Sequence, residues 1–272
     1  MSDRVMFEVG DDKVGVVTLN RPDKLNALDR GVFEGLHDAA AQARAAAEDG
    51  AVKAVLLRGA GRAFSSGLDV SLFGEMAAGD PSLQAAGGGT QDGMIAWLQQ
   101  AFTAWEDLPV PTVAAVRGVA LGGGCQLAAA CHLRVAAPDA SIGVLEVKWA
   151  IIPDLGGTYR LPRLVGLSRA IDMAVSARRV DAATALAWGL VDAVLDDEDF
   201  DAAARSYAAA LAAGPTLAQA GAARLMRESL DRTREDALAA ERATQAGCLS
   251  SADFGEAVAA AMQRRAPDFA GR

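Results

Sequence analysis

Apolar and polar positions follow a repeating order along this chain of 272 residues. Residues 5–20 form two alternating or β-branched runs parted by a Gly-Asp-Asp turn, a pattern typical of a β-hairpin. Residues 52–58 (VKAVLLR) and 112–116 (TVAAV) are short, apolar and β-branched, so they predict buried strands. Segments with helical spacing lie between and after these runs, at residues 29–47, 94–107, 168–176 and 181–188. The succession predicts a layered α/β fold.

Two stretches of small residues connect predicted strands to predicted helices. They are residues 63–69 (AFSSGLD) and the triplet Gly122-Gly123-Gly124. The first N–H groups of a helix have no partner within it and lie at the positive end of its dipole. Glycine also lets another molecule approach the main chain without meeting a Cβ. We expect these turns to offer N–H groups to a phosphate or a developing oxyanion, the simpler alternative being a tight turn that only needs glycine.

Two further segments depart from the alternation. Residues 79–93 (GDPSLQAAGGGTQDG) are the most loop-like part of the chain, and we expect a surface loop or a mobile lid there. From residue 199 onward the sequence is Ala-rich, amphipathic and helical. The chain therefore divides into a β/α core at 1–198 and a C-terminal helical region at 199–272. The apolar stripe of that region has little core left to cover, so we expect it to mediate self-association.

Composition and charge remove several classes of function. Apolar residues make up 51% of the chain, which favours a folded core. The net charge is −9 and the basic residues are scattered, so nucleic acid is not expected as a partner. The N-terminal sequence lacks the apolar segment of a signal peptide, and no apolar run reaches the ~18 residues of a membrane span. Three cysteines without CxxC spacing fit reduced thiols in the cytoplasm, with no membrane partner.

The motifs of several common chemistries are absent. The chain contains neither GxxxxGK[ST] nor GxGxxG nor GxSxG. Its only histidines are His37 and His132, which disfavours a Ser-His-Asp triad or a histidine-rich metal site. What remains is a pair of turns with free N–H groups, together with carboxylates. That set suits proton transfer beside a carbonyl, in which N–H groups stabilise an enolate and a carboxylate carries the proton.

Longer motifs resemble the crotonase (enoyl-CoA hydratase/isomerase) superfamily. They are NRPDKLNAL at 20–28, AFSSGLDV at 63–70, RGVALGGGCQLAAACHLRVAAPDASIGVLEVKWAIIPDLGGTYRLPRLVG at 117–166 and ARRVDAATALAWGLVD at 177–192. The resemblance implies a crotonase-like spiral of β/α units with a C-terminal trimerisation region, assembled as a homotrimer or a dimer of trimers. It also implies an acyl-CoA thioester substrate, with coenzyme A entering as part of that substrate and no separate cofactor or metal.

The resemblance also assigns residues to the site. The family's oxyanion hole falls on the backbone N–H groups of Leu68 and Gly123. Further contacts to substrate or coenzyme A are implied at Lys24, Ala27, Ala63, Ser65, Ser66, Gly67, Leu68, Asp69 and Gly122. Lys24 and Arg62 are the basic residues that we expect near the coenzyme's phosphates, and Trp149 is either a packing residue or part of an acyl pocket.

The acids depart from the best-known members of the family. Hydratases carry two glutamates twenty residues apart, where this chain has Gln126 and Glu146. Glutamine can orient water but cannot exchange a proton near neutral pH, which argues against hydration by the two-glutamate route. Dienoyl-CoA isomerases of the family share acids at the positions of Glu146 and Asp154, with a third acid where this chain has Gln126. We expect these three residues to be catalytic, the alternative for Asp154 being a helix N-cap.

Three functions are compatible with these residues. We favour double-bond isomerisation of an unsaturated acyl-CoA through an enolate. Hydration of a trans-2-enoyl-CoA is the close alternative, in which one well-placed glutamate both activates water and returns its proton. A non-catalytic CoA-ester binding protein is the third, and the two acids Glu146 and Asp154 argue against it because mere binding needs no acid beside the thioester.

Overall fold

The computed structural model describes residues 3–195 and 198–271. Within these ranges the main sheet has the strand order β1-β2-β3-β4-β6-β9, and a smaller sheet has the order β5-β7-β8. From β1 to β9 the strands span Val5–Val9, Val14–Leu19, Ala54–Gly59, Thr112–Val116, Val119–Leu121, Leu133–Ala136, Ser141–Gly143, Arg179–Asp181 and Ala193–Val194. The predicted hairpin is β1 paired antiparallel to β2, and the other neighbours in the main sheet are parallel. The α/β fold is thereby confirmed.

The helices occupy the connections between strands and the C-terminal part of the chain. They are α1 Arg30–Glu48, α2 Val70–Ala78, α3 Pro81–Ala86, α4 Gln91–Glu106, α5 Gly123–Ala130, α6 Gly157–Val165, α7 Leu167–Ser176, α8 Ala182–Trp188, α9 Phe200–Ala212, α10 Thr216–Ser229, α11 Arg234–Leu249 and α12 Ala252–Gln263. Short 3₁₀ helices span Pro22–Lys24 and Glu146–Trp149. Over residues 3–195 and 198–271, no helix is both long and apolar enough to cross a membrane.

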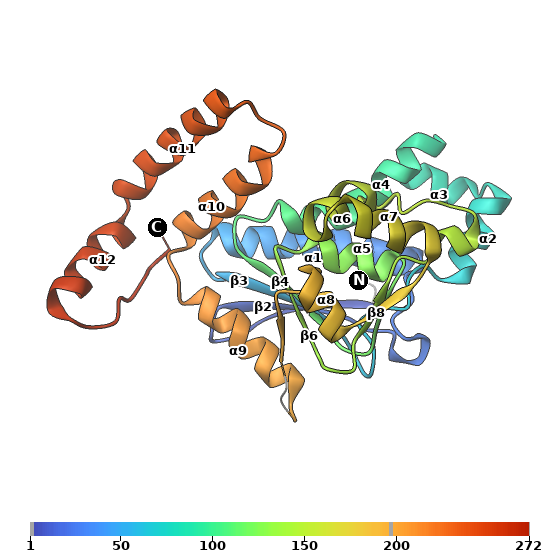
Figure 1. Cartoon of the computed structure of the whole chain (residues 1–272), viewed down its shortest axis with the longest axis horizontal. Helices are drawn as coiled ribbons and strands as arrows, with labels where there is room; N and C mark the ends of the chain where they lie inside the picture. The colour runs from blue at the N-terminus through green and yellow to red at the C-terminus, as the bar shows by residue number, and fades with distance from the viewer. Residues whose placement is uncertain (1–2, 196–197, 272) are drawn as a thin grey trace.

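Successive side chains of a strand point to opposite faces of the sheet, and both sets are apolar here. Each face therefore needs cover, and helices provide it on both sides. Leu57 and Val116 belong to a large core with residues of α1, α4 and α5. Their neighbours Leu56 and Ala115 belong to a second core with residues of α9. Figure 1 shows α9 on the opposite side of the sheet from α1 and α5. The core is therefore a sheet buried on both sides.

The boundary of the C-terminal region differs from the prediction. The predicted region starts at residue 199 and therefore includes α9, but this helix packs on β2, β3 and β4 of the main sheet. Its buried positions Ala204, Ala208 and Ala212 recur every four residues, so small side chains bring the helix close to the strands. The region that extends from the body begins at α10 (Figure 1). Residues 1–2 and 196–197 of the predicted core, and residue 272, lie outside the described residues.

Residues 79–93 are also more regular than predicted. Asp80 caps α3 by accepting the backbone N–H groups of Ser82 and Leu83, and Pro81 follows it at the first helical position. Leu83 is fully buried, and α4 begins at Gln91. An Asp-Pro pair predicts the start of a helix. The prediction of a loop rested instead on the many glycines of the segment. The segment therefore lies at the surface as predicted, but it contains a short helix that Leu83 anchors in the core.

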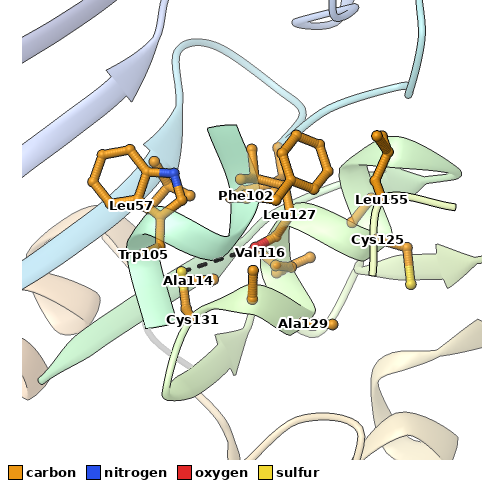
Figure 2. Close-up of a cluster of buried hydrophobic side chains, with 14 of the residues drawn as sticks. Leu57, Phe102, Trp105, Ala114, Val116, Cys125, Leu127, Ala129, Cys131 and Leu155 are labelled. Atoms are coloured by element: carbon orange, nitrogen blue, oxygen red, sulfur yellow. Dashed lines mark hydrogen bonds between the residues drawn. The ribbon is translucent and has the colours of Figure 1, made fainter. Parts of the chain in front are cut away.

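Helix α5 is buried along its whole length. Figure 2 shows Leu127 of this helix beside Phe102 and Trp105 of α4 and near Leu57 of the main sheet, all members of one buried cluster. The alanines of α5 admit these larger neighbours because their own side chains are small. Packing on all sides fixes the helix in place. Its N-terminal residue, Gly123, is therefore held by the core.

Candidate active site

The two predicted turns lie against each other. The N–H of Ser65 donates to the carbonyl of Val119 at 2.9 Å, and the N–H of Leu121 donates to the carbonyl of Ser65 at 3.0 Å. Gly67 has φ +94°, and a Cβ added there would lie 2.6 Å from the oxygen of Leu121 and 3.6 Å from the nitrogen of Gly123. Only glycine fits this position, because both the backbone angle and the close approach exclude a side chain.

The N–H groups of Leu68 and Gly123, one from each turn, make no hydrogen bond in the described part of the chain. Gly123 is the first residue of α5, so its N–H lies outside the ladder of helical hydrogen bonds. On either side of Leu68, the carbonyl of Gly67 accepts from Leu28 at 2.8 Å, and the N–H of Asp69 donates to Leu28 at 3.0 Å. The structure thus brings together the pair that the resemblance assigns to the oxyanion hole.

A cavity of about 650 Å³, which we call the thioester cavity, reaches both of these residues. Its lining includes the predicted site residues Lys24, Ala27, Ser66, Gly67, Leu68, Asp69, Gly122, Gly123 and Glu146. Lys24 is exposed, and its ammonium group has no partner among the described residues, so it is free to meet an anionic group. Contact of these residues with a substrate stays a prediction.

Glu146 and Gln126 form a buried hydrogen-bonded pair. The Nε2 of Gln126 donates to Oε1 of Glu146 at 2.6 Å, and its Oε1 accepts the N–H of Gly157 at 2.9 Å. Gln126 therefore ties the glutamate to the start of α6. The second carboxylate oxygen of Glu146, Oε2, is buried and has no hydrogen-bond partner among the described residues. Glu146 lines the thioester cavity, so Oε2 is the atom available for proton transfer.

Burial shifts the proton affinity of Glu146. Loss of solvation raises the pKa of this carboxyl above its ordinary value of 4.5, and the negative charge of Asp154 raises it further. Hydrogen bonds from its own backbone N–H and from Gln126 oppose the shift. A carboxyl whose pKa moves toward neutrality is better matched to accepting and returning a proton.

Asp154 does not cap a helix, and its catalytic role stays a prediction. Helix α6 begins at Gly157 with Gly156 at its N-cap and no side-chain cap, so the helix-cap interpretation of Asp154 is wrong. Burial raises the pKa of the Asp154 carboxyl above 3.8. Asp154 lines a second cavity rather than the thioester cavity. The Nε2 of Gln99 donates to its backbone carbonyl at 2.6 Å, which fixes the loop that carries it.

Comparison with known proteins identifies the family. The profile described as enoyl-CoA hydratase/isomerase matches residues 10–272. The chain belongs to this family. It is 33% identical over 269 residues to a probable enoyl-CoA hydratase of Mycobacterium tuberculosis, covering 96% of each chain. It is 35% identical over 268 residues to a probable enoyl-CoA hydratase of Rhodobacter capsulatus, covering 98% of each.

A solved structure supports the same conclusion. The crystal structure of a putative enoyl-CoA hydratase from Streptomyces coelicolor A3(2) superposes with a TM-score of 0.91 at 34% identity, covering 100% of this chain and 96% of that one. The predicted superfamily and its crotonase-like fold are therefore confirmed, and the protein is an acyl-CoA enzyme of the enoyl-CoA hydratase/isomerase family.

Some residues assigned through the family lie away from the cavity. Ala63 and Ser65 are buried and do not line it. The carbonyl of Ala63 accepts from Nδ2 of Asn26 at 2.7 Å, and the hydroxyl of Ser65 donates to the carbonyl of Asn26 at 2.8 Å. These two residues shape the turn rather than face the cavity, because their polar groups are already bonded inside the fold. Arg62 also lies outside the cavity lining.

Sequence reasoning missed two side chains that hold the oxyanion turn. Buried Asn26 accepts the N–H of Arg21 at 2.8 Å and bonds to the turn at Ala63. One nitrogen of Arg21, Nη1, donates to the carbonyl of Ala27 at 2.5 Å and to the carboxylate of Asp69 at 3.0 Å. Both lie in the motif NRPDKLNAL, whose polar residues were used only for the family resemblance.

Proposed function

We propose that this enzyme moves a double bond in an unsaturated acyl-CoA by abstracting and returning a proton beside the thioester carbonyl. The observation that carries the proposal is one buried carboxylate, Glu146, with a free oxygen, in a cavity that also reaches the N–H groups of Leu68 and Gly123. Oε2 takes a proton from the α-carbon of a 3-enoyl thioester, and the electron pair moves onto the thioester oxygen. The two N–H groups stabilise that oxyanion.

The second half of the reaction returns the same proton. Protonated Glu146 delivers it to the γ-carbon, the electron pair flows back from the oxygen, and the double bond ends in conjugation with the carbonyl. One carboxylate suffices because it receives and donates in turn. The other acid of the thioester cavity, Asp69, is held by Ser71 and Arg21, and its hydrogen bond from the Ser71 N–H is the main cause that lowers its pKa. Asp69 is therefore a poor proton donor.

Hydration is the second candidate, and the names of the relatives favour it. Both curated relatives at 33% and 35% identity are named probable enoyl-CoA hydratases. In that reaction Glu146 would take a proton from water and return it to the α-carbon. The two polar atoms of Gln126 are already bonded to Glu146 and Gly157, so Gln126 would contribute at most the second hydrogen of its amide to hold the water.

A substrate panel separates the candidates. Purified enzyme is incubated with matched trans-2-enoyl-, 3-enoyl- and 3,5-dienoyl-CoA, and products are separated by chromatography with mass detection. We expect the 3-enoyl thioester to be converted to the 2-enoyl isomer faster than water is added to the trans-2-enoyl thioester. Faster water addition would establish the hydratase instead. Binding of all three without turnover would leave only the CoA-ester binding protein.

Gln126→Glu is expected to raise the hydration rate. The new carboxyl would lie about where Nε2 now lies, 2.6 Å from Oε1 of Glu146. Two carboxyls at that range share one proton, because like charges in a buried site push one pKa up. Initial hydration and isomerisation rates are measured for both proteins, with Gln126→Met as a control of similar size. Fast hydration by the wild type that does not rise in Gln126→Glu would contradict the role given to Gln126.

Asp154→Asn is expected to shift the pH dependence of turnover. Glu146 works as a carboxylate, so the acid limb of kcat/KM should lie above pH 4.5, its ordinary pKa. The charge of Asp154 helps to raise that pKa, so removing the charge should move the limb to lower pH. The profile is measured with a 3-enoyl-CoA. An unmoved limb would show that the two acids do not interact, and a kcat loss confined to 3,5-dienoyl-CoA would make Asp154 a second proton carrier.

We propose further that the chain assembles as a homotrimer or a dimer of trimers. Several large apolar side chains of α10 to α12 are exposed: Met226, Leu230, Leu249, Phe254, Val258 and Met262. Such a surface in a soluble monomer is unfavourable unless another molecule covers it. Multi-angle light scattering at micromolar concentration should give three or six times the subunit mass, and Met262→Lys should lower it. A monomeric wild type would refute the assembly.

A further inference from the structure

The thioester cavity continues into a second cavity of about 970 Å³. We call the second one the acyl cavity. The two share Leu68, Phe73, Trp149 and Ile151 in their linings. Because the N–H of Leu68 is one of the two oxyanion donors, the acyl cavity begins close to the position of a bound thioester carbonyl. An acyl chain leaving that carbonyl therefore has a ready path into it.

The walls of the acyl cavity are largely apolar, buried on one side and exposed on the other, where Trp149, Ile151 and Ile152 lie. Helices α2, α3 and α4 and the segment 149–155 contribute them. The large apolar side chains of the lining are Leu68, Phe73, Met76, Leu83, Met94, Ile95, Leu98, Trp149, Ile151, Ile152 and Leu155. Leu83, Leu98 and Leu155 are at most 2% exposed, so this part of the wall is held by the core. The fold therefore fixes the inner wall of the cavity.

The charged groups of the acyl cavity are all of one sign. Glu75, Asp80 and Asp154 line it, and its lining contains no lysine, arginine or histidine. An acyl group ending in a carboxylate would meet three acids and no basic residue in this lining, and would also lose water beside the partly buried Asp154, which is unfavourable. Dicarboxylic thioesters are thereby disfavoured, while an uncharged chain meets no such penalty.

The volume of the acyl cavity and an aromatic pair where the two cavities meet further restrict which acyl group fits. Pockets of about 300–1,000 Å³ bury most of a drug-sized ligand, so the acyl cavity is at the upper end of that range. A butanoyl group would leave most of it to water. The rings of Phe73 and Trp149 stack with centroids 4.8 Å apart, which places flat apolar surface where the cavities meet. We infer that the substrate carries a large, uncharged, apolar acyl group; the inference rests on the proposed acyl-CoA chemistry.

One small residue offers a way to fill the acyl cavity. Ala77 on α2 is exposed and lines the cavity, and its neighbour Ala78 is exposed but does not line it. Neither residue belongs to the catalytic group. Ala77→Trp should occupy space that a long acyl chain needs, and Ala78→Trp adds the same bulk to the same helix outside the cavity. The pair separates cavity filling from any general effect on α2.

Binding of saturated thioesters tests the inference without relying on the reaction, because they have no double bond to move or hydrate. Isothermal titration calorimetry compares butanoyl-, decanoyl-, naphthylacetyl- and decanedioyl-CoA. Each buried methylene can tighten binding by about fourfold, so decanoyl-CoA should bind at least about tenfold more tightly than butanoyl-CoA. Decanedioyl-CoA should bind at least about tenfold more weakly than decanoyl-CoA. The naphthylacetyl arm shows whether a ring or a chain fits better.

The variants give the second half of the test. Ala77→Trp should weaken decanoyl-CoA binding by about tenfold or more and leave butanoyl-CoA within about twofold, whereas Ala78→Trp should change neither. Equal affinity of the wild type for butanoyl-, decanoyl- and naphthylacetyl-CoA, or identical behaviour of the two variants, would overturn the inference. Tight decanoyl-CoA binding without turnover of any unsaturated thioester would instead refute only the proposed reaction.

Discussion

Glu146→Gln is expected to lower kcat by about 10²- to 10⁴-fold while leaving the affinity for a saturated acyl-CoA within a few-fold. The free oxygen of Glu146 is the one buried carboxylate atom of the thioester cavity without a partner among the described residues. A glutamine has nearly the same shape, and its carbonyl oxygen can still accept from Nε2 of Gln126. The change therefore removes proton acceptance and leaves the packing in place.

A direct measurement of proton transfer makes this prediction sharper. An enzyme that forms the enolate should exchange α-hydrogens of a saturated acyl-CoA with deuterium from the solvent, which mass spectrometry detects without any net reaction. Exchange should be lost in Glu146→Gln and partly kept in Glu146→Asp, whose shorter side chain still carries a carboxylate. Unchanged exchange in Glu146→Gln would assign the proton to another residue.

Local sequence patterns predicted much of the fold because they act over a few residues. The hairpin of β1 and β2, the capping of α1 by Asp29 and the turn from residue 63 into α2 all follow from neighbouring side chains. Helix α3 was missed although Asp80 and Pro81 mark its start, because glycines dominate the surrounding segment. The packing of α9 on the sheet could not be read from its own sequence, since an Ala-rich amphipathic helix fits a core as well as an interface.

The candidate site was less predictable because it depends on contacts between distant residues. The resemblance identified Gln126 and Glu146, but only the structure shows that both polar atoms of Gln126 are engaged, one with the N–H of Gly157. From the sequence alone, Asp154 could be a catalytic acid or the N-cap of a helix. The structure shows that it does not cap α6 and that it lines the acyl cavity. Asp and Asn residues have similar local signals whether they cap a helix, hold a loop or face a cavity.

Gly123→Pro is expected to reduce kcat by about 10²- to 10³-fold, equivalent to about 3–4 kcal/mol of transition-state stabilisation. The substitution removes one of the two free N–H groups outright. Proline is well tolerated at the first position of a helix, which is where Gly123 lies, because that N–H makes no helical hydrogen bond. The preceding residue is Gly122, which has no Cβ to clash with the proline ring.

The matched control for this change is Gly123→Ala, which keeps the N–H and adds only a methyl group. That methyl would lie 3.1 Å from Cδ1 of Leu28 and 3.5 Å from Cδ1 of Leu155, contacts that small shifts of the leucine side chains can relieve. The alanine variant should therefore keep much more activity than the proline variant. Circular dichroism and thermal unfolding establish that both are folded. A folded proline variant as active as the alanine variant would mean that the N–H of Gly123 does not bind the oxyanion. Another hydrogen-bond donor would then have to stabilise the oxyanion together with the N–H of Leu68.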